Sequence, residues 1–169
     1  MDKKVLFTEN QKFRQWWILL IIALVNISFL FSINLFIADG QWGKNKTTDN
    51  VLIAGILMVA ISTMLLLNCR LETRITQEGI YFRFFPFHFK FKYYAWNSLS
   101  KCFVRHYSPV REYGGWGLRI SLTGNGNAYN VSGDKGLQLE LLSKKRLLIG
   151  TNKPEELTAV LEHLGQSKY

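Results

Sequence analysis

The chain has 169 residues and a formal net charge of +9 at pH 7. If two membrane-spanning segments take about 70 residues, roughly 100 remain, which is enough for one modest core and excludes several large domains. The two cysteines, Cys69 and Cys102, have no paired spacing, which argues against a disulfide framework or a cysteine-based metal site.

Two long apolar runs lie near the N-terminus, at residues 16–37 and 51–67, and neither contains a charged residue. At about 1.5 Å of rise per residue they reach roughly 33 Å and roughly 26 Å, against a hydrocarbon core of about 30 Å. They therefore predict a transmembrane hairpin over residues 16–69, with helices at 16–37 and 51–69. A cleaved signal peptide fits the first run less well, because the run is long and Ile37-Ala38-Asp39-Gly40 after it is a poor match to a small-x-small cleavage site.

The distribution of basic residues predicts the orientation of this hairpin. Of the 21 Lys and Arg residues, 15 lie from residue 70 onward. The others are Lys3, Lys4, Lys12 and Arg14 before the hairpin and Lys44 and Lys46 in its loop. Because basic flanks stay on the cytoplasmic side, both termini are expected in the cytoplasm, with the 38–50 loop outside a multi-pass protein of the cell membrane. Residues 1–15 are then a short cytoplasmic lead.

Small and polar residues occur within both apolar runs: Asn26, Ser28, Ser32 and Asn34 in the first, and Gly55, Ser62 and Thr63 in the second. Such residues favour close packing between helices, within the hairpin or in a dimer. A transport pathway would need ionisable groups in the span, and neither run has one.

After residue 70 the hydrophobic period changes to two. Leu71, Thr73 and Ile75 alternate with polar residues, and a turn at 77–79 leads into a strand at 80–85. Further strand-like runs lie at 101–107, 117–123, 128–131, 137–142 and 146–150, separated by turn sequences. A final helix is expected where Leu157, Val160, Leu161 and Leu164 form one apolar stripe after a capping box of Asn152 and Glu155. This predicts an α+β domain of about seven antiparallel strands and one packing helix.

Three segments carry a resemblance to a known family. They are ITQEGIY at 75–81, YAWNSL at 94–99, and RLLIGT at 146–151 leading into PEEL at 154–157. In this order they resemble the bacterial pleckstrin-homology-like (PH-like) domains, many of which follow one or two transmembrane helices in uncharacterised membrane proteins. The resemblance covers about residues 70–165. It implies a β-barrel or sandwich of two near-orthogonal sheets capped by a C-terminal helix, and a binding role without defined ligand residues.

One candidate site is a basic strand face. The alternation of residues 87–94 predicts a half-buried strand with Phe87, Phe89, Phe91 and Tyr93 inward and with His88, Lys90 and Lys92 outward. Arg74 and Arg83 are expected on neighbouring strands. Near an anionic leaflet each such cation contributes about 1 kcal/mol, so the set could hold the domain against a membrane. The alternative is an ordinary solvated strand face.

A second candidate site is the pair of glycine-rich turns at 113–117 and 132–136, where backbone N–H groups could converge on an anion beside Arg111 and Lys135. Neither turn has the strand–loop–helix context of a phosphate-binding loop. Tight turns that require a positive φ are the alternative.

Catalysis has little support in the sequence. His88, His106 and His163 are scattered, and the chain has no HExxH, CxxC or GxSxG motif. We therefore expect no enzyme and no cofactor. The excess of basic residues fits a membrane anchor better than nucleic-acid binding, since the interleaved aromatic residues are expected to face the core.

Together these patterns predict a cytosolic PH-like module at residues 70–169, and residues 71–169 are expected to fold without the hairpin. The leading hypothesis is binding to an unidentified protein partner or to a second copy of the chain. The alternative is recognition of anionic lipid headgroups. Basic residues clustered toward the membrane would favour lipid, whereas an exposed apolar patch or an open strand edge would favour protein.

Overall fold

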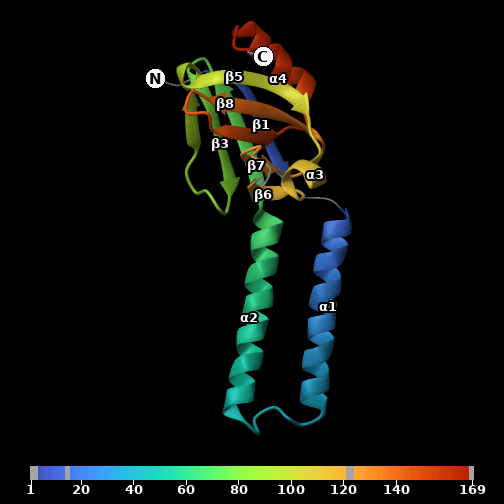
Figure 1. Ribbon diagram of the computed structural model, residues 1–169. Helices are drawn as coiled ribbons and strands as arrows, with labels where there is room; N and C mark the ends of the chain where they lie inside the picture. The colour runs from blue at the N-terminus through green and yellow to red at the C-terminus, as the bar shows by residue number, and fades with distance from the viewer. Residues whose placement is uncertain (1–3, 14–15, 121–123, 168–169) are drawn as a thin grey trace. The chain divides into compact units, whose positions relative to one another are not determined.

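In the computed structural model of the protein, the described residues are 4–13, 16–120 and 124–167. The chain divides into two compact units. One comprises Phe13–Asn68, and the other comprises Met1–Lys12 together with Cys69–Tyr169. Figure 1 draws the helices and strands of both units. Each unit is described by itself.

The first unit consists of two helices, α1 (Trp16–Ala38) and α2 (Lys46–Asn68), of 23 residues each. Both are long and apolar enough to cross a membrane, and neither contains a buried residue. Helix α2 begins five residues before the predicted start at residue 51. The side chain of Asn45 accepts a hydrogen bond from the Thr47 amide (2.9 Å) and so caps this first polar turn.

Polar and small residues join α1 to α2, as the sequence predicts for a hairpin. Asn26 Nδ2 donates to Thr63 Oγ1 across the helix pair at 3.1 Å. Gly55 faces the ring of Phe29 so closely that an added Cβ would lie 3.1 Å from it. Ser28, Ser32 and Asn34 donate to backbone carbonyls four residues earlier in α1, which satisfies their polar groups within the helix.

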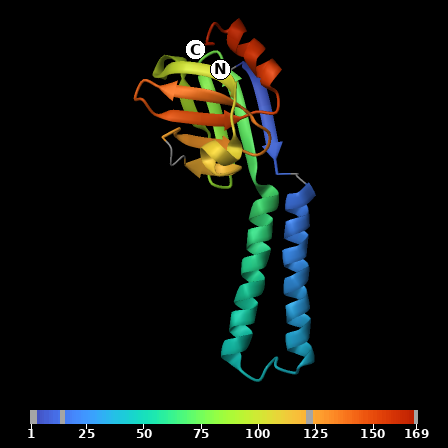
Figure 2. The same cartoon turned by 45° about the vertical axis from the view of Figure 1, so that its right-hand side comes forward.

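The second unit starts before the helices. Strand β1 (Val5–Lys12) pairs antiparallel with β2 (Arg70–Thr76), from Val5 opposite Thr76 to Lys12 opposite Arg70. Figure 2 shows β1 (blue) beside β2 (green). Residues 1–15 were expected to be only a short lead. This expectation is wrong, because Val5–Lys12 form a strand of the folded unit. The helical hairpin is an insertion between two paired strands.

Polar contacts explain why β1 belongs to the core although its sequence is polar. Phe7 is 2% exposed, and the buried Glu9 accepts hydrogen bonds from Thr151 Oγ1 (2.7 Å) and the Asn152 amide (2.8 Å). Gln11 Nε2 donates to the carbonyl of Gly150 at 2.7 Å. A buried polar group is tolerated when it is hydrogen-bonded, so the strand stays in the sheet.

The first sheet has the order β1-β2-β3-β4, where β3 is Gly79–Phe85 and β4 is Lys92–Ala95. All pairs in it are antiparallel. Its inner face consists of apolar side chains that are at most 1% exposed: Leu71, Ile75, Ile80, Phe82 and Phe84. These are the residues that the alternation of the sequence places inward on β2 and β3.

The strand predicted over residues 87–94 is wrong in its first half. Residues 86–91 connect β3 to β4 as an irregular turn, and only Lys92–Ala95 pair with β3. Phe87, Phe89 and Tyr93, expected in the core, are 65%, 74% and 46% exposed. Pro86 follows β3 directly and has no backbone N–H to donate to a strand partner. The alternating pattern therefore continues in the sequence although residues 86–91 are not paired in the sheet.

The second sheet has the order β5-β8-β9-β7-β6. Its strands are β5 (Leu99–His106), β6 (Gly117–Ile120), β7 (Asn127–Asn130), β8 (Lys135–Leu141) and β9 (Arg146–Gly150). β7 pairs parallel with β9, so the expected all-antiparallel arrangement is wrong at this position. The strand expected at 117–123 is observed to Ile120, and residues 121–123 lie outside the described part of the chain.

The two sheets pack against each other without closing into a barrel. The rings of Phe82 on β3 and Tyr129 on β7 lie 4.9 Å apart between their centroids, and Trp96, in the short 3-10 helix η1 (Trp96–Ser98), donates to the carbonyl of Thr76. The barrel alternative is therefore not observed, while the two sheets and the C-terminal helix are. Among the described residues nine strands are present, where about seven were predicted.

Helix α4 (Pro154–His163) packs on β5 and β1. Leu157 and Leu161 are each 1% exposed, which confirms the predicted apolar stripe. The expected capping box is wrong. The N-cap is Lys153, without a side-chain hydrogen bond, while Asn152 Oδ1 accepts from Ser132. A five-residue helix, α3 (Pro109–Tyr113), covers part of the second sheet.

Candidate binding surface

The outer face of the first sheet collects three arginines around one carboxylate. Register places Glu72 opposite Arg83, on the face away from the apolar core. Glu72 Oε1 lies 2.8 Å from Arg83 Nη2 and 2.9 Å from Arg70 Nε, and Glu72 Oε2 lies 4.0 Å from Arg74 Nη2. One carboxylate among three guanidinium groups leaves an excess of two positive charges on this face.

Glu72 orders these cations without hiding them. Its side chain is 10% exposed, whereas those of Arg70, Arg74 and Arg83 are 35%, 48% and 24% exposed. A guanidinium group has five N–H donors, so a single carboxylate leaves several of them free to bind an oxyanion. The arrangement can therefore receive a phosphate or carboxylate at little cost in side-chain ordering.

Aromatic rings lie beneath the same guanidinium groups. The ring of Phe91 lies 4.5 Å from the guanidinium carbon of Arg74 and 4.7 Å from that of Arg83, and Arg70 lies 5.2 Å from the ring of Phe85. Cation–π contacts of this kind hold a guanidinium plane against a ring. We call the group Arg70, Arg74, Arg83, Phe85 and Phe91 the arginine–aromatic surface.

A shallow hollow of about 200 Å³ opens on the same sheet. It is lined by Val5, Arg74, Thr76, Tyr81 and Phe91. Aromatic and aliphatic walls with one guanidinium group suit a small group that is partly apolar and negatively charged.

The arginine–aromatic surface includes the end of the sheet from which the chain continues into the two helices. Arg70 is register partner of both Lys12 and Phe85. α2 ends at Asn68, two residues before Arg70, and Phe13 follows Lys12 toward α1. Phe85 is the last residue of β3, so the turn at 86–91 starts at this same end.

The five residues predicted as one basic face do not lie together. Arg74 and Arg83 belong to the arginine–aromatic surface, and Lys90 is exposed on the adjoining turn. His88 and Lys92 instead face Tyr129 of the second sheet. Lys92 Nζ lies 3.1 Å from Tyr129 Oη, and the rings of His88 and Tyr129 lie 5.4 Å apart.

The environment of His88 disfavours its charged form. Burial and then the neighbouring charge of Lys92 lower the pKa of His88 below its ordinary value. Both effects oppose protonation, so His88 contributes little positive charge near neutral pH. The expected division into inward phenylalanines and outward cations fails for two reasons. Residues 87–91 are not in a strand, and in β4 the faces are reversed, because Lys92 contacts Tyr129 while Tyr93 is 46% exposed and stacks on Tyr81.

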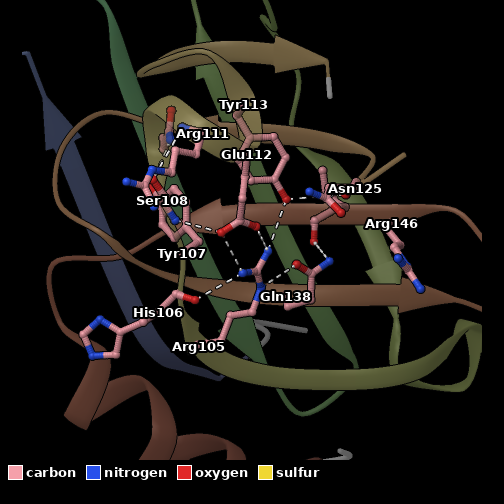
Figure 3. Close-up of polar contacts among 12 residues, drawn as sticks. Arg105, His106, Tyr107, Ser108, Arg111, Glu112, Tyr113, Asn125, Gln138 and Arg146 are labelled. Atoms are coloured by element: carbon pink, nitrogen blue, oxygen red, sulfur yellow. Dashed lines mark hydrogen bonds and ion pairs between the residues drawn. The ribbon is translucent and has the colours of Figure 1, made fainter. Parts of the chain in front are cut away.

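A separate polar cluster fixes α3 on the second sheet (Figure 3). Arg105 donates to Glu112 Oε2 at 2.7 Å and to Gln138 Oε1 at 3.0 Å, while Glu112 Oε1 accepts from the Ser108 amide at 2.8 Å. Burial acts to lower the pKa of Arg105, but the hydrogen bond and charge of Glu112 outweigh burial, so the pKa of Arg105 is raised. The hydrogen bond from Arg105 lowers the pKa of Glu112. Because these side chains are hydrogen-bonded to one another, we regard the cluster as a structural clamp between α3 and the second sheet.

The glycine-rich turns use their donors within the protein. Gly114 caps α3 with φ of +72°, and the Gly117 amide donates to Asn130 Oδ1 at 2.8 Å. Gly133 has φ of +75°, and Lys135 Nζ lies 3.3 Å from Glu155 Oε1. These contacts favour the tight-turn alternative over an anion site.

The described part of the chain contains no cluster of side chains that could bind a metal ion. No three His, Cys, Asp or Glu side chains of residues 4–13, 16–120 and 124–167 come together as metal ligands. Cys69 and Cys102 are both buried. Burial raises the pKa of the Cys69 thiol to about 11, which keeps it protonated near neutral pH.

Sequence reasoning missed Arg70, Phe85 and Phe91 as members of this surface. The alternation of Arg70, Glu72 and Arg74 on one strand was a usable signal, because it places all three on one face. Arg83 and the rings join them through strand register and the path of the 86–91 turn. Neither the register nor the path of this turn can be predicted from local periodicity.

Comparisons with protein-family models, with curated proteins and with solved structures find no match to this chain.

Proposed function

We propose that the protein is an integral membrane protein whose PH-like domain binds acidic lipid headgroups through the arginine–aromatic surface. The observation that carries the proposal is the group of three arginines around Glu72 at the end of the sheet joined to α1 and α2. A guanidinium fork matches phosphate oxygens in a bidentate way.

The pairing of β1 with β2 supports a hairpin that crosses the membrane twice. Two paired strands share one aqueous compartment, and α1 and α2 lie between them in sequence. If each helix crosses once, the chain returns to the side on which it began. The basic flanks favour the cytoplasm for that side.

Tethering strengthens a weak headgroup contact. Each exposed cation near an anionic leaflet contributes about 1 kcal/mol, so three arginines with one carboxylate give only modest free affinity. A domain covalently held at the bilayer meets the headgroups at a high effective concentration, and the contact becomes intramolecular.

Lipid retention by the full chain tests the proposal. Protein purified in a neutral detergent is mixed with phosphatidylglycerol or phosphatidylcholine, and bound lipid is counted by native mass spectrometry. We expect preferential retention of phosphatidylglycerol, which weakens as salt rises. Arg74→Gln with Arg83→Gln should lower it several-fold, whereas the charge-matched control Lys101→Gln with Arg111→Gln should not. Equal retention of both lipids by the wild type would refute the proposal.

A second candidate, protein binding or self-association, is favoured by one observation. β6 is an edge strand, and its Leu118 and Ile120 are 37% and 70% exposed. Exposed apolar edges are templates for pairing with another chain. Under this alternative, Ile120→Lys should reduce the cross-linked dimer of the full chain in native membranes.

A further inference from the structure

We infer that the turn between β3 and β4, residues 86–91, inserts Phe87 and Phe89 into the interface of the bilayer that α1 and α2 cross. Phe87 is 65% exposed and Phe89 is 74% exposed, while Phe7, Phe82 and Phe84 of the same unit are at most 2% exposed. Two neighbouring phenylalanines in water are unfavourable unless something covers them.

Contacts within the turn hold these rings in place. Phe89 packs edge-on against Phe85 with 5.7 Å between ring centroids, and Phe87 stacks on Phe84 at 5.8 Å. The amide of His88 donates to the carbonyl of Phe84 at 2.8 Å. The core residue Phe84 thus supports the turn from within, so exposure of the rings is a property of an ordered turn.

The covalent chain limits how far this turn can lie from the membrane. α2 ends at Asn68 and β2 begins at Arg70, a step of two residues that spans at most about 7 Å. Phe85 is the register partner of Arg70, on a strand about 5 Å away, and the turn starts at the next residue. The inference rests on the proposed crossing of the membrane by α2.

Chemistry favours lipid over a protein as the occupant of this turn. Lys90 lies within the turn, and Arg70 and Arg83 lie at its base. Aromatic rings flanked by Lys and Arg suit the membrane interface, where rings enter the boundary of the acyl chains and cations meet phosphates. The turn would thereby fix the domain against the bilayer at a point other than its covalent links.

Depth measurements on the full chain in phosphatidylcholine vesicles test the inference. Nitroxide labels are placed at Phe89→Cys and, separately, Phe87→Cys, with the exposed Asn97 of the same unit as an aqueous control. Leu57→Cys in α2 serves as a bilayer control. Relaxation by oxygen and by a water-soluble nickel complex is compared. We expect oxygen to dominate at 57, 87 and 89 and the nickel complex to dominate at 97.

The outcomes separate this inference from its premises. If the label at 57 lies in the bilayer but those at 87 and 89 are accessible to nickel, the insertion is refuted and the crossing stands. If 57 is also accessible to nickel, both fail. If 87 and 89 are shielded from both reagents, a protein covers the turn and insertion is refuted. Neutral lipid keeps the result independent of acidic headgroup binding.

Discussion

Glu72 organises the outer face of the first sheet. A single carboxylate, 10% exposed in its side chain, lies within 4.0 Å of three guanidinium groups. Because the arginines are partly exposed, each pair alone is worth little. The shared carboxylate nevertheless offsets repulsion between cations that cation–π contacts also hold in place. Glu72 therefore affects both the stability of this sheet face and the arrangement of the arginines in the proposed lipid contact.

Replacement of Glu72 by Gln should destabilise the folded unit by about 1–3 kcal/mol, because three neighbouring cations lose their common anion. Chemical unfolding of the full chain in detergent measures this change. Glu162→Gln, on the exposed side of α4, is the control and should change stability by no more than about 0.5 kcal/mol. An unchanged midpoint for Glu72→Gln would show that the arginines do not need this carboxylate.

The clamp between Arg105 and Glu112 predicts a dependence on pH. The hydrogen bond that Arg105 donates to Glu112 lowers the pKa of Glu112 below the ordinary 4.5 in the folded state. The stabilisation is therefore complete above about pH 4.5 and is lost as pH falls through the lower folded-state pKa. Glu112→Gln should flatten this acid limb of the stability curve, measured by urea unfolding between pH 3 and pH 6. Glu162→Gln should keep the wild-type limb.

At the scale of elements, β1 changes what counts as the domain. It supplies the buried Phe7 and hydrogen bonds that reach residues 150–152. The expectation that residues 71–169 fold without the hairpin omits this strand. Without it, β2 would keep β3 but lose its other partner, and Gly150, Thr151 and Asn152 would lose their hydrogen bonds to Gln11 and Glu9.

A fragment test separates the strand from the helices. Residues 71–169 alone should fail to melt cooperatively, whereas residues 4–12 joined to residues 70–169 by a short Asn-Gly hairpin loop should fold. Lys12 and Arg70 are register partners, so a hairpin loop can replace the inserted helices. Phe7→Ala in the joined protein should cost about 3–5 kcal/mol. A cooperative melt of 71–169 with the same midpoint as the joined protein would contradict this role.

At the scale of the whole molecule, strand pairing constrains topology more strongly than charge does. β1 and β2 must lie in one compartment, whichever side of the membrane that is, because their backbones are hydrogen-bonded. The orientation itself follows only from the distribution of basic residues. One labelling experiment can therefore test both the shared compartment of β1 and β2 and the side of the membrane on which it lies.

Cysteine labelling in intact cells should distinguish the loop from the strands. Thr47→Cys should react with an impermeant thiol reagent, while Thr8→Cys and Lys153→Cys should react only after permeabilisation. All three positions are exposed, and the native cysteines are buried. Labelling of both Thr8→Cys and Lys153→Cys from outside would reverse the orientation. Different behaviour of those two positions would contradict the β1–β2 pairing.

Local pattern predicted much of the strand content. The period-two runs at 70–76 and 80–85 correspond to β2 and β3, and the apolar stripe at 157–164 faces the sheets in α4. β1 was missed because Glu9 and Gln11 are polar by composition and become buried only through partners more than 130 residues away. The parallel pairing of β7 with β9 is likewise a non-local choice.

The candidate surface shows the same division. That Arg70, Glu72 and Arg74 share a face follows from strand geometry alone. That His88 and Lys92 lie away from Arg83 does not, because Pro86 ends β3 and the chain turns before β4. Tertiary contacts with Tyr129 then select the positions of both side chains.

Local sequence pattern is sufficient to predict the two long apolar helices and the final amphipathic helix. Length and composition of an apolar run are local quantities, and so is the period of a helix stripe. Two features could not be predicted locally: a strand before the helices completes the sheet after them, and arginines from two strands meet over phenylalanine rings. Both depend on register between segments far apart in the chain, and register is set by which partner satisfies the backbone and buries the side chains.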